Sequence, residues 1–131
     1  MMRLIFAGLM GVLLFAGTAV AGDTHKDYLY FRDANVPPFQ KSREFFDMPD
    51  RPGHYGITLV SDDIGPLTFR ILRVEDDVEK LIKHHRSYSL KDHEFSMRFE
   101  NPKGKYDLIV EIANSNPLSR SSVSVIVVEE P

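Results

Sequence analysis

The sequence predicts an all-β domain in which two antiparallel sheets pack as a sandwich, of the jelly-roll-like or Ig-like kind. Apolar and polar residues alternate with period two over several short stretches, the pattern of antiparallel strands that bury one face. Turn-forming clusters separate these stretches, for example Ser61-Asp62-Asp63-Ile64-Gly65-Pro66. The 131 residues give room for one domain of ordinary size.

The first strand candidate covers residues 28–32 and is rich in aromatic side chains. Residues 33–53 follow, and their four prolines, at positions 37, 38, 49 and 52, deny them a helix or a central strand. We expect a loop or edge segment that wraps the domain with its aromatic residues underneath. Residues 22–53 are thus predicted as an N-terminal strand and Pro-rich wrapping segment, in a single domain with a sandwich core over 54–131.

Five further strand candidates lie in that core. The alternation predicts strands over residues 55–60, 67–72, 94–99, 106–113 and 122–127. In the fourth of them, one buried face should be shared by Tyr106, Leu108, Val110 and Ile112. Val123, Val125 and Val127 should likewise share a buried face, and Ile109 would be buried on the opposite face if a loop covers it.

One segment of the core departs from period two. Val78, Leu81, Ile82 and His85 lie at the spacing i, i+3, i+4, i+7, and Asp76 or Asp77 is available as an N-cap. This spacing predicts one short helix over about 77–85, in a crossover loop of the sandwich. The alternative is a polar strand and a hairpin.

The last part of the chain carries a resemblance to known families. Gly104-Lys105-Tyr106 leads into an apolar strand that ends at Asn114, and a Ser-containing loop and a Val-rich final strand follow. Over about the last 75 residues this order resembles the emp24/GOLD sandwich family and is similar to the bacterial pre-peptidase C-terminal type of domain. Both are small, non-catalytic antiparallel β-sandwiches, so the resemblance implies a role in protein interaction, cargo handling or attachment.

The first 21 residues have the order of a secretory signal peptide. Arg3 is their only charge, an apolar stretch follows, and Ala19-Val20-Ala21 is a small-x-small cleavage pattern. The apolar stretch is short for a membrane span, which needs ~20 residues, although an uncleaved N-terminal anchor is the alternative. We expect cleavage after Ala21 or Gly22 and no membrane span afterwards. An exported chain without cysteines suits a bacterial envelope, so the expected location is periplasmic or secreted.

The composition and the absence of known motifs exclude several classes of function. The absence of Cys excludes disulfides, thiolate metal sites and a cysteine nucleophile, and a net charge of -3 argues against nucleic acid as a partner. The sequence contains no phosphate loop, no dinucleotide fingerprint, no H-E-x-x-H and no Gly-x-Ser-x-Gly elbow. We therefore predict no enzyme and no cofactor. The favoured interpretation is an exported accessory module that binds another envelope or extracellular component, with an envelope protein as its partner.

Three regions could carry such binding: the loop over residues 114–122, the segment over residues 33–53, and a free sheet edge. The candidate binding residues are Asn114, Asn116, Ser119, Arg120, Phe45 and Phe46. The aromatic residues that precede the regular strands either close the bottom of the sandwich or form an exposed patch.

The alternative function is a periplasmic protein that handles metal, copper in particular. Asp23-Thr24-His25 would place His25 third in a chain that begins at Asp23, where an amine, two amides and an imidazole suit Cu(II). His84, His85 and His93 form a second candidate group. Lys83 and Arg86 flank His84 and His85 and would repel a cation. We therefore expect the three histidine side chains to be mostly exposed and not to converge.

Overall fold

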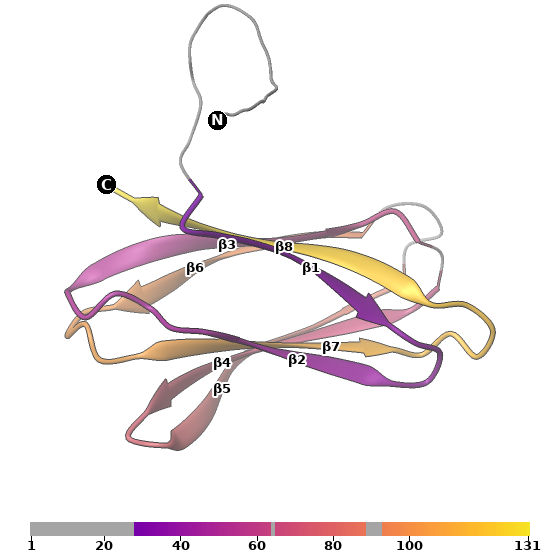
Figure 1. Ribbon diagram of the computed structural model, residues 1–131, viewed down its shortest axis with the longest axis horizontal. Coiled ribbons are helices and arrows are strands. Elements are labelled where there is room, and N and C mark those ends of the chain that lie inside the picture. Colours follow the sequence, from indigo (N-terminus) through magenta and orange to yellow (C-terminus); the bar gives the residue numbers. More distant parts are fainter. Residues whose placement is uncertain (1–27, 64, 89–92) are drawn as a thin grey trace, which may run out of the picture.

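Two four-stranded antiparallel sheets pack face to face in the computed structural model, which describes residues 28–63, 65–88 and 93–131 (Figure 1). The first sheet has the order β1-β8-β3-β6 and the second β2-β7-β4-β5. The strands are β1 (Tyr30–Val36), β2 (Lys41–Phe46), β3 (Gly53–Ser61), β4 (Leu67–Glu75), β5 (Val78–Ser87), β6 (His93–Asn101), β7 (Asp107–Asn114) and β8 (Ser121–Glu130). The described ranges hold no helix that could span a membrane. The expected signal peptide over 1–21 lies outside them.

The strand order is that of a jelly roll. Each connection between successive described strands passes from one sheet to the other, except the one between β4 and β5. The antiparallel pairs are nested around that connection, β4 with β5, β3 with β6, β2 with β7 and β1 with β8. Eight strands in two such sheets define the double-sheet jelly roll. The predicted sandwich is confirmed, and of its two variants the jelly roll is the one observed.

The core lies between the two sheets and consists of the alternate residues that the period-two pattern points inward. Leu108, Val110 and Ile112 are fully buried, as are all three valines predicted for the last strand. Tyr106 precedes β7 and is only half-buried against this cluster. Ile109 is also buried, but it lies on the outer face of the second sheet. The predicted register of the last two strands is thus confirmed.

The expected helix over 77–85 is wrong, because these residues belong to the β4–β5 hairpin. The pairing of β4 with β5 shifts register between Ile71 and Leu72, which leaves Ile82 as the extra residue of a β-bulge. Ile82 packs against the core, as does the ring of His85 three residues later. A bulge adds one residue to the alternation, and the result imitates the spacing of a helix.

The Pro-rich segment, for which a loop or an edge segment is expected, contains a regular edge strand, β2. In β2, Ser42, Glu44 and Phe46 point inward and the residues between them point outward. β1 and β2 are the edge strands on one side of the sandwich. Arg32 bridges them there, 3.5 Å from Glu44 and with its guanidinium 4.2 Å from the centre of the Phe46 ring. Polar residues are tolerated on the inner side of β2 because this edge of the core is open to water.

The β4–β5 turn places two aspartates in the left-handed backbone region. Asp76 has φ 51° and Asp77 has φ 64°, the conformation of the two central residues in a type I′ hairpin turn. Glycine is favoured at such positions because side chains with a Cβ crowd the following carbonyl there.

Replacing Asp77 with glycine should therefore stabilise the fold by about 1 kcal/mol. The urea midpoint of D77G should rise, whereas D77N, which removes the same charge and keeps a Cβ, should gain less. D62G serves as the control, because Asp62 is an exposed turn residue outside the left-handed region. An unchanged or lowered midpoint for D77G would contradict the turn geometry.

Truncating a central core side chain should cost far more than truncating an outer one. Val110 is fully buried in β7, so V110A should lower the free energy of unfolding by about 2 kcal/mol by leaving a cavity in a packed core. Val60 lies on the outer face of the first sheet and is 38% exposed. V60A should change the urea midpoint little, and equal effects of the two substitutions would refute the register.

Candidate functional site

The outer face of the second sheet carries exposed aromatic, aliphatic and basic residues, and we call it the concave face. Strand pairing arranges its side chains in rows that cross the sheet from β2 through β7 and β4 to β5. The three central rows are Lys41–Ala113–Thr68–Arg86, Arg43–Glu111–Arg70–His84 and Phe45–Ile109–Leu72–Leu81. The first two rows are rich in cations and the third is wholly apolar.

The bulge in β5 decides which residues this strand contributes to the face. Leu81 pairs with Leu72, and His84 pairs with Arg70, so two residues three apart point the same way. In a regular strand, two residues three apart would point to opposite faces, so the bulge at Ile82 keeps both Leu81 and His84 on this face. The concave face therefore depends on the same irregularity that imitates a helix in the sequence.

A buried carboxylate, that of Glu111, lies at the centre of the concave face. Glu111 is only 5% exposed although it lies on an outer surface. Its Oε1 accepts a hydrogen bond of 2.9 Å from Arg70, and its Oε2 accepts one from Arg43. Because each carboxylate oxygen already has a guanidinium partner, Glu111 fixes the two arginines in place.

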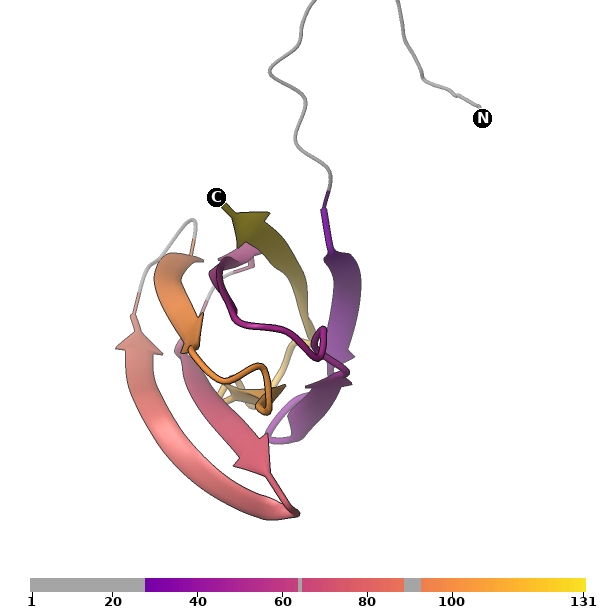
Figure 2. The same cartoon turned by 90° about the vertical axis from the view of Figure 1, so that its left-hand side faces the viewer.

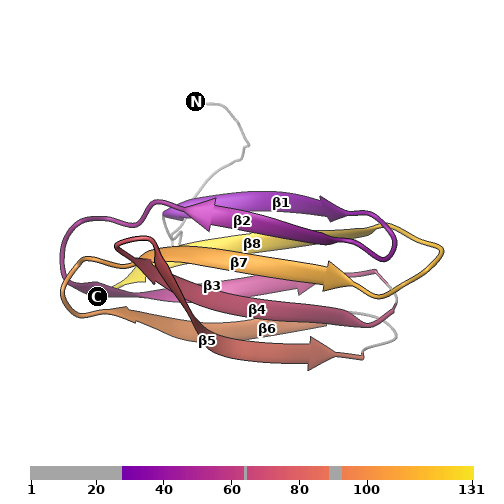
Figure 3. The same ribbon diagram turned by 90° about the horizontal axis from the view of Figure 1, so that it is seen from below.

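A second ion pair shows that the face is hollowed. Arg43 on β2 also pairs with Glu79 on β5, at the far side of the sheet. On a flat sheet their Cα atoms would be roughly 20 Å apart, beyond the reach of the two side chains. The β4–β5 hairpin instead curls toward β2, as the curved β5 in Figure 2 and the view from below in Figure 3 show. Hydrogen bonds to Glu79 and Glu111 raise the pKa of Arg43 above its ordinary value, so this guanidinium stays charged.

The apolar row has a covered centre and exposed ends. Ile109 and Leu72 are 5% and 6% exposed, since they lie between the two strands that the Arg43–Glu79 pair connects. Phe45 and Leu81 at the two ends are 51% and 42% exposed. An aromatic and an aliphatic side chain thus stand on opposite walls of the hollow, where a partner could reach both.

The basic rows carry charge that the face itself does not neutralise. Lys41 and Arg86, at the two ends of one row, are exposed and form no ion pair within the described residues. The Arg86 guanidinium lies 5.2 Å from the centre of the Tyr88 ring instead. The face is locally positive although the whole chain has a net charge of -3.

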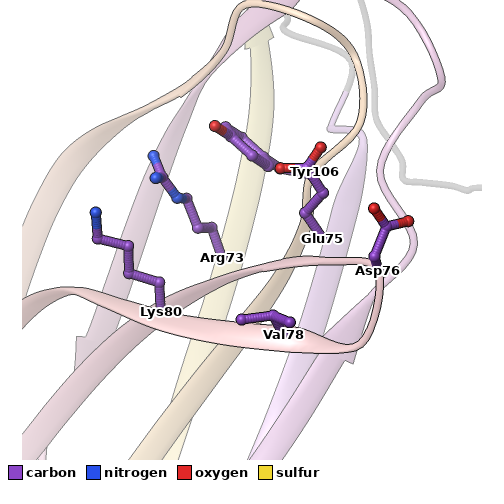
Figure 4. A pocket seen from close by; sticks show the side chains of 6 residues that line it. All are labelled: Arg73, Glu75, Asp76, Val78, Lys80 and Tyr106. Atoms are coloured by element: carbon purple, nitrogen blue, oxygen red, sulfur yellow. The ribbon is translucent and has the colours of Figure 1, made fainter.

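A small pocket lies on the other side of the curled hairpin. It has a volume of about 370 Å³ and is lined by Arg73, Glu75, Asp76, Val78, Lys80 and Tyr106 (Figure 4). The Arg73 guanidinium lies 4.5 Å from the centre of the Tyr106 ring, so one face of this ring is already covered. Two cations and two carboxylates balance each other in the lining, which gives the pocket no preference for either sign of charge.

Two of the predicted binding residues, Asn114 and Asn116, organise the loop between β7 and β8. Asn114 is buried, and its Nδ2 donates to the carbonyls of Val36 at 3.0 Å and Ser119 at 2.9 Å. The Oδ1 of Asn116 accepts from the backbone N–H groups of Leu118 and Ser119. These asparagines have a structural role that accounts for their hydrogen bonds.

The other predicted binding residues separate in space. Ser119 and Arg120 are exposed in the same loop. Phe46 is fully buried in the core, whereas its neighbour Phe45 lies on the concave face. Phe45 pairs with Ile109, five residues along β7 from Asn114, or about 17 Å away. The structure therefore does not bring the six residues into one site.

The histidines of the metal hypothesis also separate. His84 is exposed on the concave face, and the half-buried His85 ring stacks at 4.6 Å on Phe95. His93 is fully buried, which corrects the expectation that all three are mostly exposed, and its Nδ1 hydrogen-bonds the Ser87 hydroxyl at 2.5 Å. The described residues contain no group of three or more side chains placed to hold a metal ion. His25 lies outside the described residues.

Most of the concave face was not identified from the sequence. Arg43, Arg70 and Glu111 are separated by long stretches of chain, and only the strand order places them side by side. Alternation in Lys41-Ser42-Arg43-Glu44-Phe45 was a usable signal for outward-facing cations. The prolines on both sides of this stretch favoured a loop over a strand, so the alternation was not interpreted as a strand.

Comparisons with known proteins support the fold. No family model matches the sequence, and no curated protein matches it significantly. The chain is similar in structure to the Yersinia pseudotuberculosis-derived mitogen, with a TM-score of 0.58, 15% identity, and 77% of this chain and 85% of that chain covered. For PirA the TM-score is 0.52 with 15% identity and coverage of 82% and 100%. A chain of the cowpea mosaic virus top component gives 0.58, 11% identity and 86% coverage of both chains.

Asp107, at one corner of the concave face, provides a test of its electrostatics. Burial raises the pKa of Asp107, and the nearby carboxylates of Asp47 and Asp50 raise it further. A folded-state pKa above the unfolded value means that stability is greatest when Asp107 is protonated and is lost as pH rises through the folded pKa. Oδ1 of Asp107 accepts a 2.9 Å hydrogen bond from the Met48 N–H, which an asparagine can also accept.

D107N should therefore have a higher urea midpoint than the wild type at pH 7. The difference should shrink as the pH falls toward 3, where Asp107 is itself neutral in both states. D33N, at an exposed aspartate on the outer face of the first sheet, is the matched control. A D107N variant less stable than the wild type at pH 7 would show that the charge of Asp107 is favourable.

Proposed function

We propose that this chain is an exported, non-catalytic β-sandwich that binds another envelope or extracellular component through the concave face. The partner is an envelope protein, and the location is the periplasm or the medium of a bacterium. The hollowed surface on which exposed Phe45 and Leu81 flank a covered apolar centre, beside a row of arginines, carries this proposal.

The composition of the concave face supports binding to a protein. Aromatic residues and arginine are enriched in protein interfaces, and residues of this kind contribute most of the binding energy. Two of the three arginines in the central rows of this face, Arg43 and Arg70, are already fixed by Glu111. A partner that binds them would order few additional side chains, which lowers the entropic cost of association.

The N-terminal sequence supports export. The N-terminal 21 residues have the order of a signal peptide. The resemblance to emp24/GOLD and pre-peptidase C-terminal domains implies the same class of non-catalytic interaction domain. None of the three solved structures above is described as a member of these families, so the resemblance stays a prediction.

Export has a direct test. The protein, expressed with its own N-terminus in a Gram-negative host, should be found in the periplasm or the medium. N-terminal sequencing should begin at Gly22 or Asp23. A full-length product in the cytoplasm would contradict the proposal.

Binding is tested by charged substitutions on the concave face. Labelled mature protein should bind saturably to washed envelopes of the source organism, and F45D/L81D should weaken that binding by at least tenfold, because a buried carboxylate without a partner is costly. F31D is the control, since Phe31 is 54% exposed on the outer face of the first sheet. Wild-type binding that F45D/L81D leaves intact, or the absence of any saturable binding, would overturn the proposal.

A further inference from the structure

We propose that the partner of the concave face is an acidic polypeptide surface that presents carboxylates next to apolar side chains. This inference rests on the proposed function and adds the chemistry of the partner. It follows from the division of the face into a basic half, formed by the Lys41 and Arg43 rows, and an apolar half, formed by the adjacent Phe45 row.

The basic half carries more positive charge than the carboxylates on the same face neutralise. Glu111 and Glu79 pair with Arg43, and Glu111 also pairs with Arg70. Lys41 and Arg86 form no ion pair within the described residues. Between them stand only Ala113 and Thr68, which are small, so a carboxylate on a partner can approach both cations without a steric obstacle.

The apolar half requires a partner with more than negative charge. Phe45 follows Lys41 by four positions in β2. At about 3.4 Å per residue, the Lys41 and Phe45 rows are therefore about 14 Å apart. Carboxylates and large apolar groups at such spacings occur together on protein surfaces. An anionic polysaccharide supplies the charges but has no large apolar group to cover Phe45 and Leu81.

The shape of the face argues against a membrane. The Arg43–Glu79 ion pair connects the two walls of the hollow, and Ile109 and Leu72 are 5% and 6% exposed beneath it. Acyl chains cannot reach side chains that are already covered, which leaves a bilayer only the exposed ends of the apolar row, Phe45 and Leu81. A protein surface can contact these two exposed ends and the exposed cations Lys41 and Arg86 together.

The experiment measures binding of the mature protein to washed envelopes as a function of NaCl concentration. Affinity of the wild type should fall as salt rises, because exposed charges are screened. K41E/R86E should weaken binding at least tenfold at low salt and make the salt dependence shallower. K103E/K105E changes the net charge equally at two exposed lysines in the β6–β7 connection, and it should change affinity less than twofold. Proteinase K treatment of the envelopes should abolish binding.

Three results would overturn the inference. The first is binding that K41E/R86E and K103E/K105E affect equally. The second is envelope binding that survives proteinase K. The third is binding of the same affinity to phosphatidylglycerol vesicles or to heparin, which assigns the face to a lipid or a polysaccharide. In each case F45D/L81D still weakens envelope binding if the proposed function is right, so the two failures are distinguishable.

Discussion

The fold depends on one pairing constraint, the nesting of four strand pairs around the β4–β5 turn. Leu67 pairs with Ser87, Gly53 with Asn101, and Lys41 with Ala113. Each of these pairs is symmetric in the sequence about position 77, inside the turn. The jelly roll is thus one long hairpin that is rolled up, and a change in register at its tip would propagate outward. Because side chains alternate with period two, a slip of one residue would turn the core residues of a strand toward solvent.

The bulge in β5 is needed to satisfy this constraint. At the tip, Glu75 pairs with Val78, a pair that is symmetric about the bond between Asp76 and Asp77. Farther from the turn than the bulge, the β4–β5 pairs are symmetric about Asp77 itself, because the unpaired Ile82 adds one residue to β5. A bulge also bends its strand and increases the local twist. The curl that lets Glu79 reach Arg43 therefore has the same origin as the register of the outer strand pairs, and the concave face results from how the fold closes.

Sequence patterns predicted the strands in which inward-facing residues are apolar. Leu108, Val110 and Ile112 alternate with residues of the other face, and their burial could be predicted from that alternation alone. β2 and β5 could not be assigned with the same ease. They are edge strands whose sides are both partly open to water, so polar residues are tolerated on both, and β5 contains a bulge as well. The candidate site was less predictable still, because it combines residues from four strands whose neighbours are set by the nested pairing.

The rolled hairpin also separates charge in a way that the net charge conceals. Asp33, Glu94, Glu100 and Glu130 lie on the outer face of the first sheet, where Arg98 is paired with the last two. The concave face of the second sheet carries Lys41, Arg43, Arg70 and Arg86 against Glu79, Asp107 and Glu111, so it is the less acidic of the two faces. The two faces point in opposite directions, so a chain that is mildly acidic overall has a dipole across its thin dimension. Such a dipole orients a molecule as it approaches a charged partner and rejects like-charged surfaces. The nested pairing thus determines the curvature of the concave face and also which charged residues lie on it.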